Sequence, residues 1–165
     1  MIISVIAAIA KNGVIGRSNG EMPWHVKEEF QHFRNTTLGY PLIMGRKSYD
    51  ALGKPLKGRL NIVLTRNGGF NPGYEEVLVF NDMNEALAHC KKASYERAFI
   101  IGGGKIFEEY ISIADEMILS FMNFDAVGDV LFPEINKDVW DMVSVEKRSE
   151  FDIKIFKRRK AVRVE

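Results

Sequence analysis

The sequence predicts a single α/β domain, residues 1–165, built on a central mixed and mostly parallel β-sheet with about four flanking helices and a C-terminal antiparallel hairpin. Three observations predict this class. Apolar runs rich in Ile and Val alternate with helical stretches. Several of these runs are apolar throughout, which is typical of parallel strands covered on both faces. No repeat, low-complexity tract or Pro/Ser-rich linker divides the chain.

The expected elements follow the chain in order. Strands are predicted for the β-branched and apolar runs Ile2–Ala10, Pro41–Met44, Asn61–Thr65, Val77–Phe80, Ala98–Ile101 and Glu116–Phe124. Helices are predicted between them, at His25–Thr37, Arg46–Ala51, Asn84–Ala93 and Lys105–Tyr110. From Asp115 on, the chain has strands and turns without a long helix, so an antiparallel hairpin is expected from roughly Val139 to Val162.

The composition is that of a soluble globular protein and indicates neither a nucleic acid nor a membrane as partner. The net charge is +1, from 23 Lys and Arg against 22 Asp and Glu, and 46% of the residues are hydrophobic. The apolar run Ile2–Ala10 follows no basic segment and ends too soon for a signal peptide or a membrane span. The basic run Lys157–Lys160 is expected to be a solvated terminal strand.

The one cysteine, Cys90, cannot form an intramolecular disulfide, which suits a reducing, cytoplasmic location. It falls in the predicted helix Asn84–Ala93, where we expect a packed thiol. The three histidines, His25, His32 and His89, show no ligand spacing with Cys90, so no metal site is expected.

An acidic residue interrupts the apolar stripe of the helix that follows Met22-Pro23-Trp24. At about 100° per residue, Glu29 shares a helix face with Val26, Phe30 and Phe33. A buried carboxylate is unfavourable unless a partner satisfies it, so a role in catalysis is one explanation for an acid at position 29. The alternative, at about even odds from the helix alone, is that Glu29 lies at the edge of the stripe and reaches water. The expected solvated face consists of Lys27, Glu28, Gln31, His32 and Arg34.

Basic and glycine residues follow several of the predicted strands. Gly102-Gly103-Gly104-Lys105 and Gly45-Arg46-Lys47-Ser48 each lead from a strand into a helix, where free N–H groups can bind an anion. Thr65-Arg66 ends another strand. The first turn lacks the nucleotide-triphosphate and dinucleotide fingerprints, so it indicates only an anion site. We expect these basic residues to converge at the carboxyl edge of the sheet. There they suit a dinucleotide with an additional phosphate, which favours NADPH over NADH.

Taken together, these segments resemble dihydrofolate reductase over essentially the whole chain. The resemblance rests on the order and spacing of Ile6-Ala7-Ala8, Asn12–Gly16, Met22-Pro23-Trp24, Glu29 with Phe33, Ile43–Arg46, Pro55–Asn61, Ile100–Gly104, Gly128-Asp129 and Phe132-Pro133. It implies NADPH-dependent reduction of 7,8-dihydrofolate, with hydride transfer from nicotinamide C4 to pterin C6 and a proton to N5. A monomer that binds antifolate inhibitors is also implied.

The resemblance implies roles for individual residues. Glu29 binds the pterin and supports protonation, with Met22, Trp24 and Ser120 as catalytic partners. Arg59 pairs with the α-carboxylate of the glutamate tail, a bidentate task suited to arginine. Substrate contacts are implied for Ile6, Ala7, Glu29, Phe30, Phe33, Leu52, Leu56, Arg59, Ile101 and Ser120. Cofactor contacts are implied for Ala8, Ile15, Gly16, Gly45, Arg46, Lys47, Ser48, Leu64, Thr65, Arg66, Ile101, Gly102, Gly103, Gly104, Lys105, Ile106 and Phe107.

The resemblance also carries expectations about pKa and motion. At the ordinary pKa of about 4.3 only about 0.2% of a Glu is protonated at pH 7, so we expect burial to raise the pKa of Glu29. Lys11–Trp24 matches a mobile loop over the nicotinamide, one residue longer here than in many bacterial members. Gly102-Gly103 matches a pair joined by a cis peptide, Ser120 replaces the usual Thr, and Phe107 replaces a frequent Tyr.

Two other functions remain open from sequence. The first is a pyrimidine reductase of riboflavin synthesis with the same fold, whose ligand has a ribityl phosphate and no glutamate tail. The second is a catalytically silent NADPH-binding module. The combination of Glu29 with Arg59 argues against the first, and only turnover excludes the second.

Overall fold

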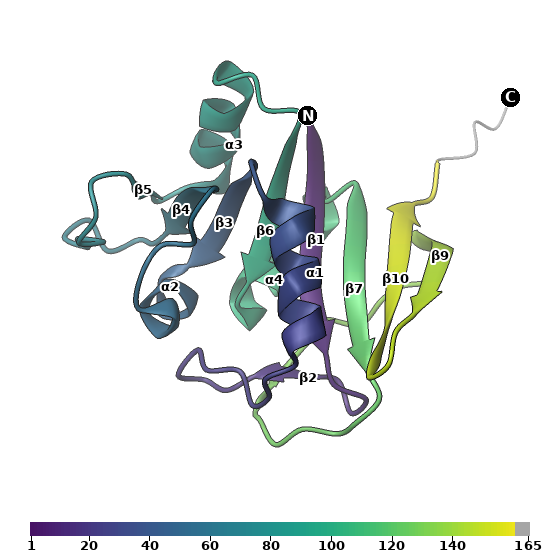
Figure 1. Ribbon diagram of the computed structural model, residues 1–165. Coiled ribbons are helices and arrows are strands. Elements are labelled where there is room, and N and C mark those ends of the chain that lie inside the picture. The colour runs from purple at the N-terminus through teal and green to yellow at the C-terminus, as the bar shows by residue number, and fades with distance from the viewer. Residues whose placement is uncertain (161–165) are drawn as a thin grey trace, which may run out of the picture.

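The computed structural model describes residues 1–160 and confirms the α/β class. An eight-stranded sheet has the order β5-β4-β3-β6-β1-β7-β10-β9 (Figure 1). Pairs from β5 to β7 are parallel, whereas β10 pairs antiparallel with both of its neighbours. The strands are β1 (Ile2–Ile9), β3 (Pro41–Gly45), β4 (Leu60–Leu64), β5 (Leu78–Phe80), β6 (Arg97–Gly102), β7 (Glu116–Met122), β9 (Trp140–Lys147) and β10 (Phe151–Arg158).

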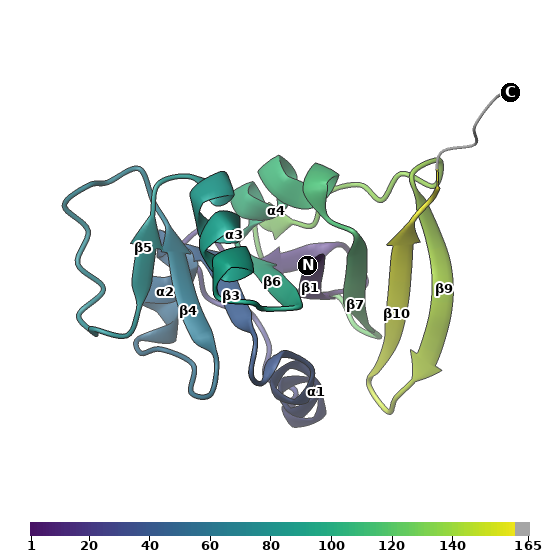
Figure 2. The same cartoon turned by 90° about the horizontal axis from the view of Figure 1, so that it is seen from above.

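Helices cover both faces of the sheet. Viewed from above, α1 (Lys27–Thr37) lies on one face, and α3 (Met83–Lys92) and α4 (Gly104–Tyr110) lie on the other (Figure 2). The short helix α2 (Arg46–Leu52) contributes its buried Tyr49 to the core on the α1 side. Cys90 of α3 is fully buried, as predicted. No helix within residues 1–160 combines the length and apolarity needed to cross a bilayer.

Every predicted strand and helix is present, with shifted ends. Helix α1 begins at Lys27 rather than His25, because Val26 is extended (φ −118°) and acts as its N-cap residue. The hairpin is confirmed as β9 and β10, while the last two residues of its predicted range, 161–162, lie outside the described part of the chain. Three short elements were not predicted: the 3-10 turn Ile111–Ile113 and the strands β2 (Val14–Gly16) and β8 (Val130–Leu131), which form a small second sheet.

The basic run Lys157–Lys160 at the end of β10 is largely exposed, as expected, and only Arg158 is half-buried. The Arg158 guanidinium donates to the carbonyl oxygens of Ile111, Ser112 and Ala114 and lies 4.7 Å from the centre of the Trp140 ring. Arg159 pairs with Asp141 at 2.7 Å. The Arg158 contacts attach the hairpin to the turn before β7, and the Arg159 pair joins β10 to β9, so this part of the basic run has a structural role.

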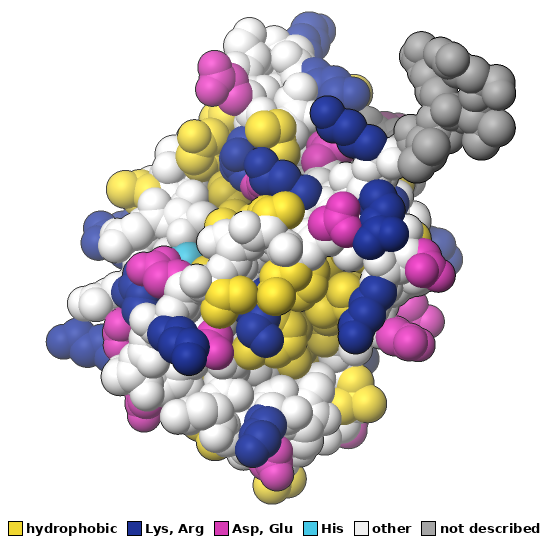
Figure 3. All heavy atoms as spheres, turned by 90° about the vertical axis from the view of Figure 1, so that its right-hand side faces the viewer, with side chains coloured by type: hydrophobic (Ala, Val, Ile, Leu, Met, Phe, Trp, Pro, Cys, Tyr) yellow, Lys and Arg dark blue, Asp and Glu magenta, His cyan; other side chains and the backbone are white. Residues whose placement is uncertain are grey.

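Strand β9 forms the edge of the sheet and is exposed after its first residue. Its apolar side chains Met142, Val143 and Val145 are among the exposed large hydrophobic residues. On this side of the molecule, Figure 3 shows a group of apolar side chains surrounded by charged ones. The register of β10 with β9 shifts between Ile155 and Phe156. Flanking charges and such irregularities typically prevent an edge strand from pairing with a strand of another molecule.

Candidate active site

Candidate functional side chains recur every four residues along helix α1, which lies over an apolar cluster on its side of the sheet. Glu29, Phe33 and Thr37 are spaced i, i+4 and i+8, and therefore share one helix face. At 1.5 Å per residue, Glu29 and Thr37 are about 12 Å apart along the axis. The site therefore has an acidic end at Glu29 and, where Thr37 meets Arg59, a basic end.

At the acidic end, Glu29 is only 4% exposed, so the alternative in which it reaches water at the edge of the stripe is wrong. Burial raises the pKa of Glu29 to about 7, and a hydrogen bond with Ser120 opposes this rise. Ser120 is buried in β7, next to Ala8 of β1 in the strand register. The pair is therefore a carboxyl group that titrates near neutral pH and a hydroxyl that partly stabilises its charged form.

Trp24 lies on the same side of the sheet and carries an unsatisfied polar atom. Its indole packs edge-on against Phe124, with the ring centres 5.8 Å apart. The Nε1 atom is buried and has no hydrogen-bond partner among residues 1–160. A buried donor without a partner is unfavourable, so this N–H can bind a ligand or a water at the site.

The predicted apolar contacts divide into inner walls and a rim. Ile6, Phe33, Leu56 and Ile101 belong to the core cluster on the α1 side of the sheet, together with Trp24. The side chains of Met22, Phe30 and Leu52 are 41%, 38% and 40% exposed and form part of the rim. Phe30 is therefore not buried in the stripe. Ala7 packs into the cluster on the opposite face, because neighbouring residues of a strand alternate.

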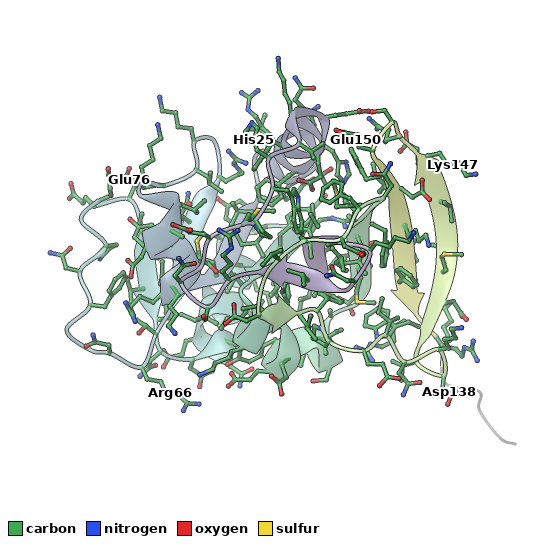
Figure 4. The ribbon with its side chains drawn as sticks, turned by 90° about the horizontal axis from the view of Figure 1, so that it is seen from below. His25, Arg66, Glu76, Asp138, Lys147 and Glu150 are labelled. Atoms are coloured by element: carbon green, nitrogen blue, oxygen red, sulfur yellow. The ribbon has the colours of Figure 1, made fainter. Side chains whose placement is uncertain are left out.

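His32 was expected on the solvated face of α1 but is half-buried. Its Nε2 atom is buried without a partner among the described residues, and burial, with the positive charge of Arg148, lowers the pKa of His32. The cause is the turn between β9 and β10, where Arg148 and Ser149 donate to the Glu28 carboxylate at 3.3 and 2.9 Å. Figure 4 shows Glu150 of this turn near α1.

At the basic end, Arg59 is held in place from several directions. Its Nε donates to the Lys57 carbonyl at 3.0 Å and its Nη1 donates to the Thr37 hydroxyl at 3.2 Å. The guanidinium also lies 5.9 Å from the centre of the Phe33 ring. Buried Asn61 fixes the surrounding loop by donating to the carbonyls of Leu56 and Arg59. Within residues 1–160 these contacts leave Nη2 without a partner, so it can bind an anion such as a carboxylate.

The two glycine turns lie against each other at the carboxyl edge of the sheet. A Cβ on Gly45, before α2, would come 3.2 Å from Ile106 of α4, and one on Gly103 would come 3.2 Å from the Ser48 hydroxyl of α2. The Gly102–Gly103 peptide bond is cis, as the resemblance implied. A Cβ on Gly104 would come 2.5 Å from Val130. The glycines thus let the two turns pack closely against each other, which we call the glycine cradle.

Basic residues surround this cradle. Lys47 and Lys105 are exposed in the first turns of α2 and α4, and Arg46 pairs with Asp50 at 2.8 Å. Leu64 pairs with Gly45 in the register of β3 and β4, which places Thr65 and Arg66 beyond the same edge. In Figure 4, Arg66 points outward at the opposite end of the β4–β5 loop from Glu76.

Some predicted cofactor contacts fall on the α4 face of the sheet. Ile15, Ile106 and Phe107 pack in the cluster with α3 and α4, and the buried Phe107 ring lies 5.2 Å from Phe132. A Cβ on Gly102, whose φ is +108°, would meet the Phe107 ring at 2.8 Å. The Phe107 ring therefore packs against Gly102 of the turn. An aromatic side chain without a hydroxyl suits this buried position.

The expected mobile loop, Lys11–Trp24, is attached near its start and in its middle. Ser18 N donates to Asp129 at 2.8 Å, and Asn12 donates to the Ala126 carbonyl at 2.8 Å. Gly20 (φ +90°) fits against α2, where a Cβ would come 2.6 Å from the Lys47 carbonyl oxygen. These attachments were not predicted from the sequence, although Asn12 and Asp129 are residues typical of turns. Thr37 and Asn61, which fix Arg59, were not predicted either.

Comparisons with known proteins point to one family over most of the chain. A family model described as dihydrofolate reductase matches residues 2–159. The type 3 dihydrofolate reductase of Salmonella typhimurium is 40% identical over 134 residues, 81% of this chain and 80% of that protein. The dihydrofolate reductase of Haemophilus influenzae is 35% identical over 148 residues, 90% of this chain and 89% of that protein. A structure of dihydrofolate reductase from Enterococcus faecalis, complexed with NADP(H) and RAB-propyl, matches with a TM-score of 0.86 and 31% identity, covering 96% of this chain and 97% of that one.

Proposed function

The chain belongs to the dihydrofolate reductase family and is an NADPH-dependent dihydrofolate reductase, and from this premise we propose which of its residues perform the reaction. NADPH, when bound, supplies the hydride that reduces the pterin at C6. The protein must then hold the pterin, provide a proton for N5 and exclude water. The observation that carries the assignment is Glu29, a buried carboxyl group whose pKa is raised to about 7.

Glu29 supports protonation of the substrate. With a pKa of about 7, about half of the Glu29 carboxyl groups carry a proton at pH 7, against about 0.3% at the ordinary value of 4.5. The Ser120 hydroxyl orients the carboxyl group, and the free Trp24 N–H holds a water beside it. The ionised form accepts hydrogen bonds from the 2-amino group and ring N–H of the pterin.

The substrate lies along α1 with its pterin at Glu29 and its tail at Arg59. Ile6, Phe33, Leu56 and Ile101 contact the ring and its benzoyl extension, and Phe30, Leu52 and Met22 close over it from the rim. Ala7 contributes through its main chain, since its side chain faces the other side of the sheet. Arg59 binds the α-carboxylate through the guanidinium group that Thr37 and Phe33 hold in place.

The glycine cradle and its basic residues hold the cofactor. The main chain at Gly45 and Gly102–Gly104, with Ser48, binds the pyrophosphate, since free N–H groups at the start of a helix favour an anion. Arg46, Lys47, Lys105 and, after β4, Leu64-Thr65-Arg66 bind the charged end that carries the additional phosphate. Ala8, Ile15, Gly16 and Ile101 flank the nicotinamide, with Ile106 and Phe107 supporting the turn.

Steady-state assays of NADPH oxidation test this function. Dihydrofolate should support rapid turnover, and the ribityl-phosphate pyrimidine of riboflavin synthesis should not. Replacing Glu29 by Gln should slow dihydrofolate reduction strongly while NADPH still binds. Turnover of the pyrimidine substrate, or NADPH binding without turnover of dihydrofolate, would contradict the assignment.

The chain acts as a single domain and a monomer in the cytoplasm, where the free, buried Cys90 thiol remains reduced. Inhibitors shaped like the pterin bind the same elongated site, as expected from the complex of the Enterococcus faecalis enzyme. Sedimentation equilibrium tests the monomer: the mass should equal that of one 18.8 kDa chain at assay concentrations.

A further inference from the structure

Asparagine followed by glycine occurs three times in the chain, at Asn12-Gly13, Asn19-Gly20 and Asn67-Gly68. In such a pair the main-chain nitrogen of the glycine can attack the side-chain amide carbon of the asparagine, because glycine has no Cβ to hinder the approach. All three asparagines are exposed, so accessibility does not separate them. What separates them is how firmly the fold holds the two reacting groups.

Hydrogen bonds hold two of the three pairs. The Asn12 amide donates to the Ala126 carbonyl at 2.8 Å and accepts from Ala126 N at 3.2 Å, and Gly13 N donates to a main-chain carbonyl at 2.8 Å. In the second pair, Gly20 N donates to the Arg17 carbonyl at 2.9 Å. Each attacking nitrogen is therefore engaged, and it can reach its asparagine only after local opening of the loop.

The third pair, Asn67-Gly68, lies in an open turn after β4. Phe70 N donates to the Asn67 carbonyl at 3.1 Å, so Gly68 takes the first central position of the turn. Within residues 1–160, Gly68 N donates no hydrogen bond, and a Cβ on Gly68 would meet no atom within 4 Å. The nitrogen that must attack is thus free in the folded protein.

The amide carbon of Asn67 is also activated. Gly69 N donates to Asn67 Oδ1 at 3.0 Å. This hydrogen bond draws electron density away from the amide carbon and stabilises the negative charge that develops on the oxygen during attack.

We propose that Asn67 is a site of spontaneous deamidation in the folded enzyme, in preference to Asn12 and Asn19. A bond forms between Gly68 N and Asn67 Cγ, the bond from Cγ to Nδ2 breaks, and ammonia leaves with the proton that Gly68 N gives up. Water then adds to either carbonyl of the cyclic succinimide and opens it to aspartate or isoaspartate. The only co-reactant is water, and nothing is oxidised or reduced.

The modification changes the charge beside the cofactor site. Asn67 N donates to the Thr65 hydroxyl at 3.1 Å, which attaches the turn to the end of β4, and Arg66 points outward next to it (Figure 4). This consequence rests on the proposed function, which assigns Arg66 to the additional phosphate of NADPH. A carboxylate at position 67 repels that phosphate and competes with it for Arg66, so NADPH binds more weakly while NADH is little affected.

Prolonged incubation of the folded protein at pH 8, followed by peptide mapping with mass spectrometry, tests the site. The peptide with Asn67 should convert from amide to acid several-fold faster than the peptides with Asn12 and Asn19. The same incubation in urea is the control for the fold, because all three pairs then lose their hydrogen bonds and should react at similar rates. Equal rates in the folded protein, or conversion of Asn12 or Asn19 before Asn67, would overturn the proposal.

Steady-state kinetics with NADPH and NADH test the consequence. Asn67→Asp should raise KM for NADPH by up to about fivefold, as expected for one exposed charge interaction, and leave KM for NADH nearly unchanged. KM for NADPH should drift toward the same value in the incubated unaltered protein but not in Asn67→Gln, whose longer side chain closes a ring slowly. An unchanged KM in Asn67→Asp, or an equal drift in Asn67→Gln, would overturn the effect on the cofactor. Failure of freshly prepared protein to reduce dihydrofolate would instead contradict the proposed function, while the peptide map would still decide the modification.

Discussion

Replacing Glu29 by Gln should make the protein more stable at alkaline pH while it removes the catalytic acid. The physical reason is that the Glu29 carboxyl group is buried and has its pKa raised from 4.5 to about 7. The folded state therefore binds this proton more tightly than the unfolded state does. Gln has nearly the same shape and carries no charge to desolvate.

The sign and size follow from linkage between proton binding and folding. An acid with a raised pKa in the folded state does not oppose folding below pH 4.5, and its destabilising effect grows between pH 4.5 and about 7. Above that range the effect is constant at about 3 kcal/mol, from 1.36 kcal/mol per pH unit. At pH 5 the same relation gives only about 1 kcal/mol.

Urea unfolding at pH 5 and pH 8 measures this effect as the free energy of unfolding of the variant minus that of the unaltered protein. This difference should increase by about 2 to 3 kcal/mol, in favour of the variant, from pH 5 to pH 8. Glu28→Gln is the matched control, since that carboxylate is accessible and pairs with Arg148. A difference for Glu29→Gln that does not change with pH would refute the reasoning.

Three further substitutions test other parts of the site. Arg59→Lys should raise KM for dihydrofolate about tenfold or more with little change in kcat, because lysine cannot form the bidentate pair; an unchanged KM would argue against the tail contact. Gly102→Ala should lower the free energy of unfolding by about 2 kcal/mol or more and weaken NADPH binding, since φ is +108° and the new Cβ would lie 2.8 Å from Phe107; calorimetry and cofactor titration measure both. Arg66→Gln should weaken binding of NADPH more than NADH, and equal losses for the two cofactors would remove Arg66 from the additional phosphate.

The sequence predicted the strands and helices well because most of them are long and patterned. It could not predict β2 and β8, since strands of three and two residues are too short to show a period. Nor does the alternation of strands and helices determine the strand order, in which β1 lies between β6 and β7. That order decides which strand ends meet at the site.

Glu29 could be found from sequence because an acid in an apolar stripe is a local anomaly. The positions of its neighbours on α1 were less predictable. Phe30 is at the rim. His32 is half-buried because the β9–β10 turn packs on α1 through Arg148, 120 residues from Glu28. Similarly, the sequence indicated Arg59 only through a family resemblance, and the contacts with Thr37 and Asn61 that fix it are tertiary.

The most direct test of the account is the rate of hydride transfer to dihydrofolate, measured in single-turnover experiments between pH 5 and 9. The account predicts a rate that falls as pH rises through about 7, where Glu29 loses its proton, and a variant Glu29→Gln that is slow and lacks this titration. A rate independent of pH in the unaltered enzyme, or normal transfer in the variant, would contradict the claim that the buried Glu29 is the acid of this reductase.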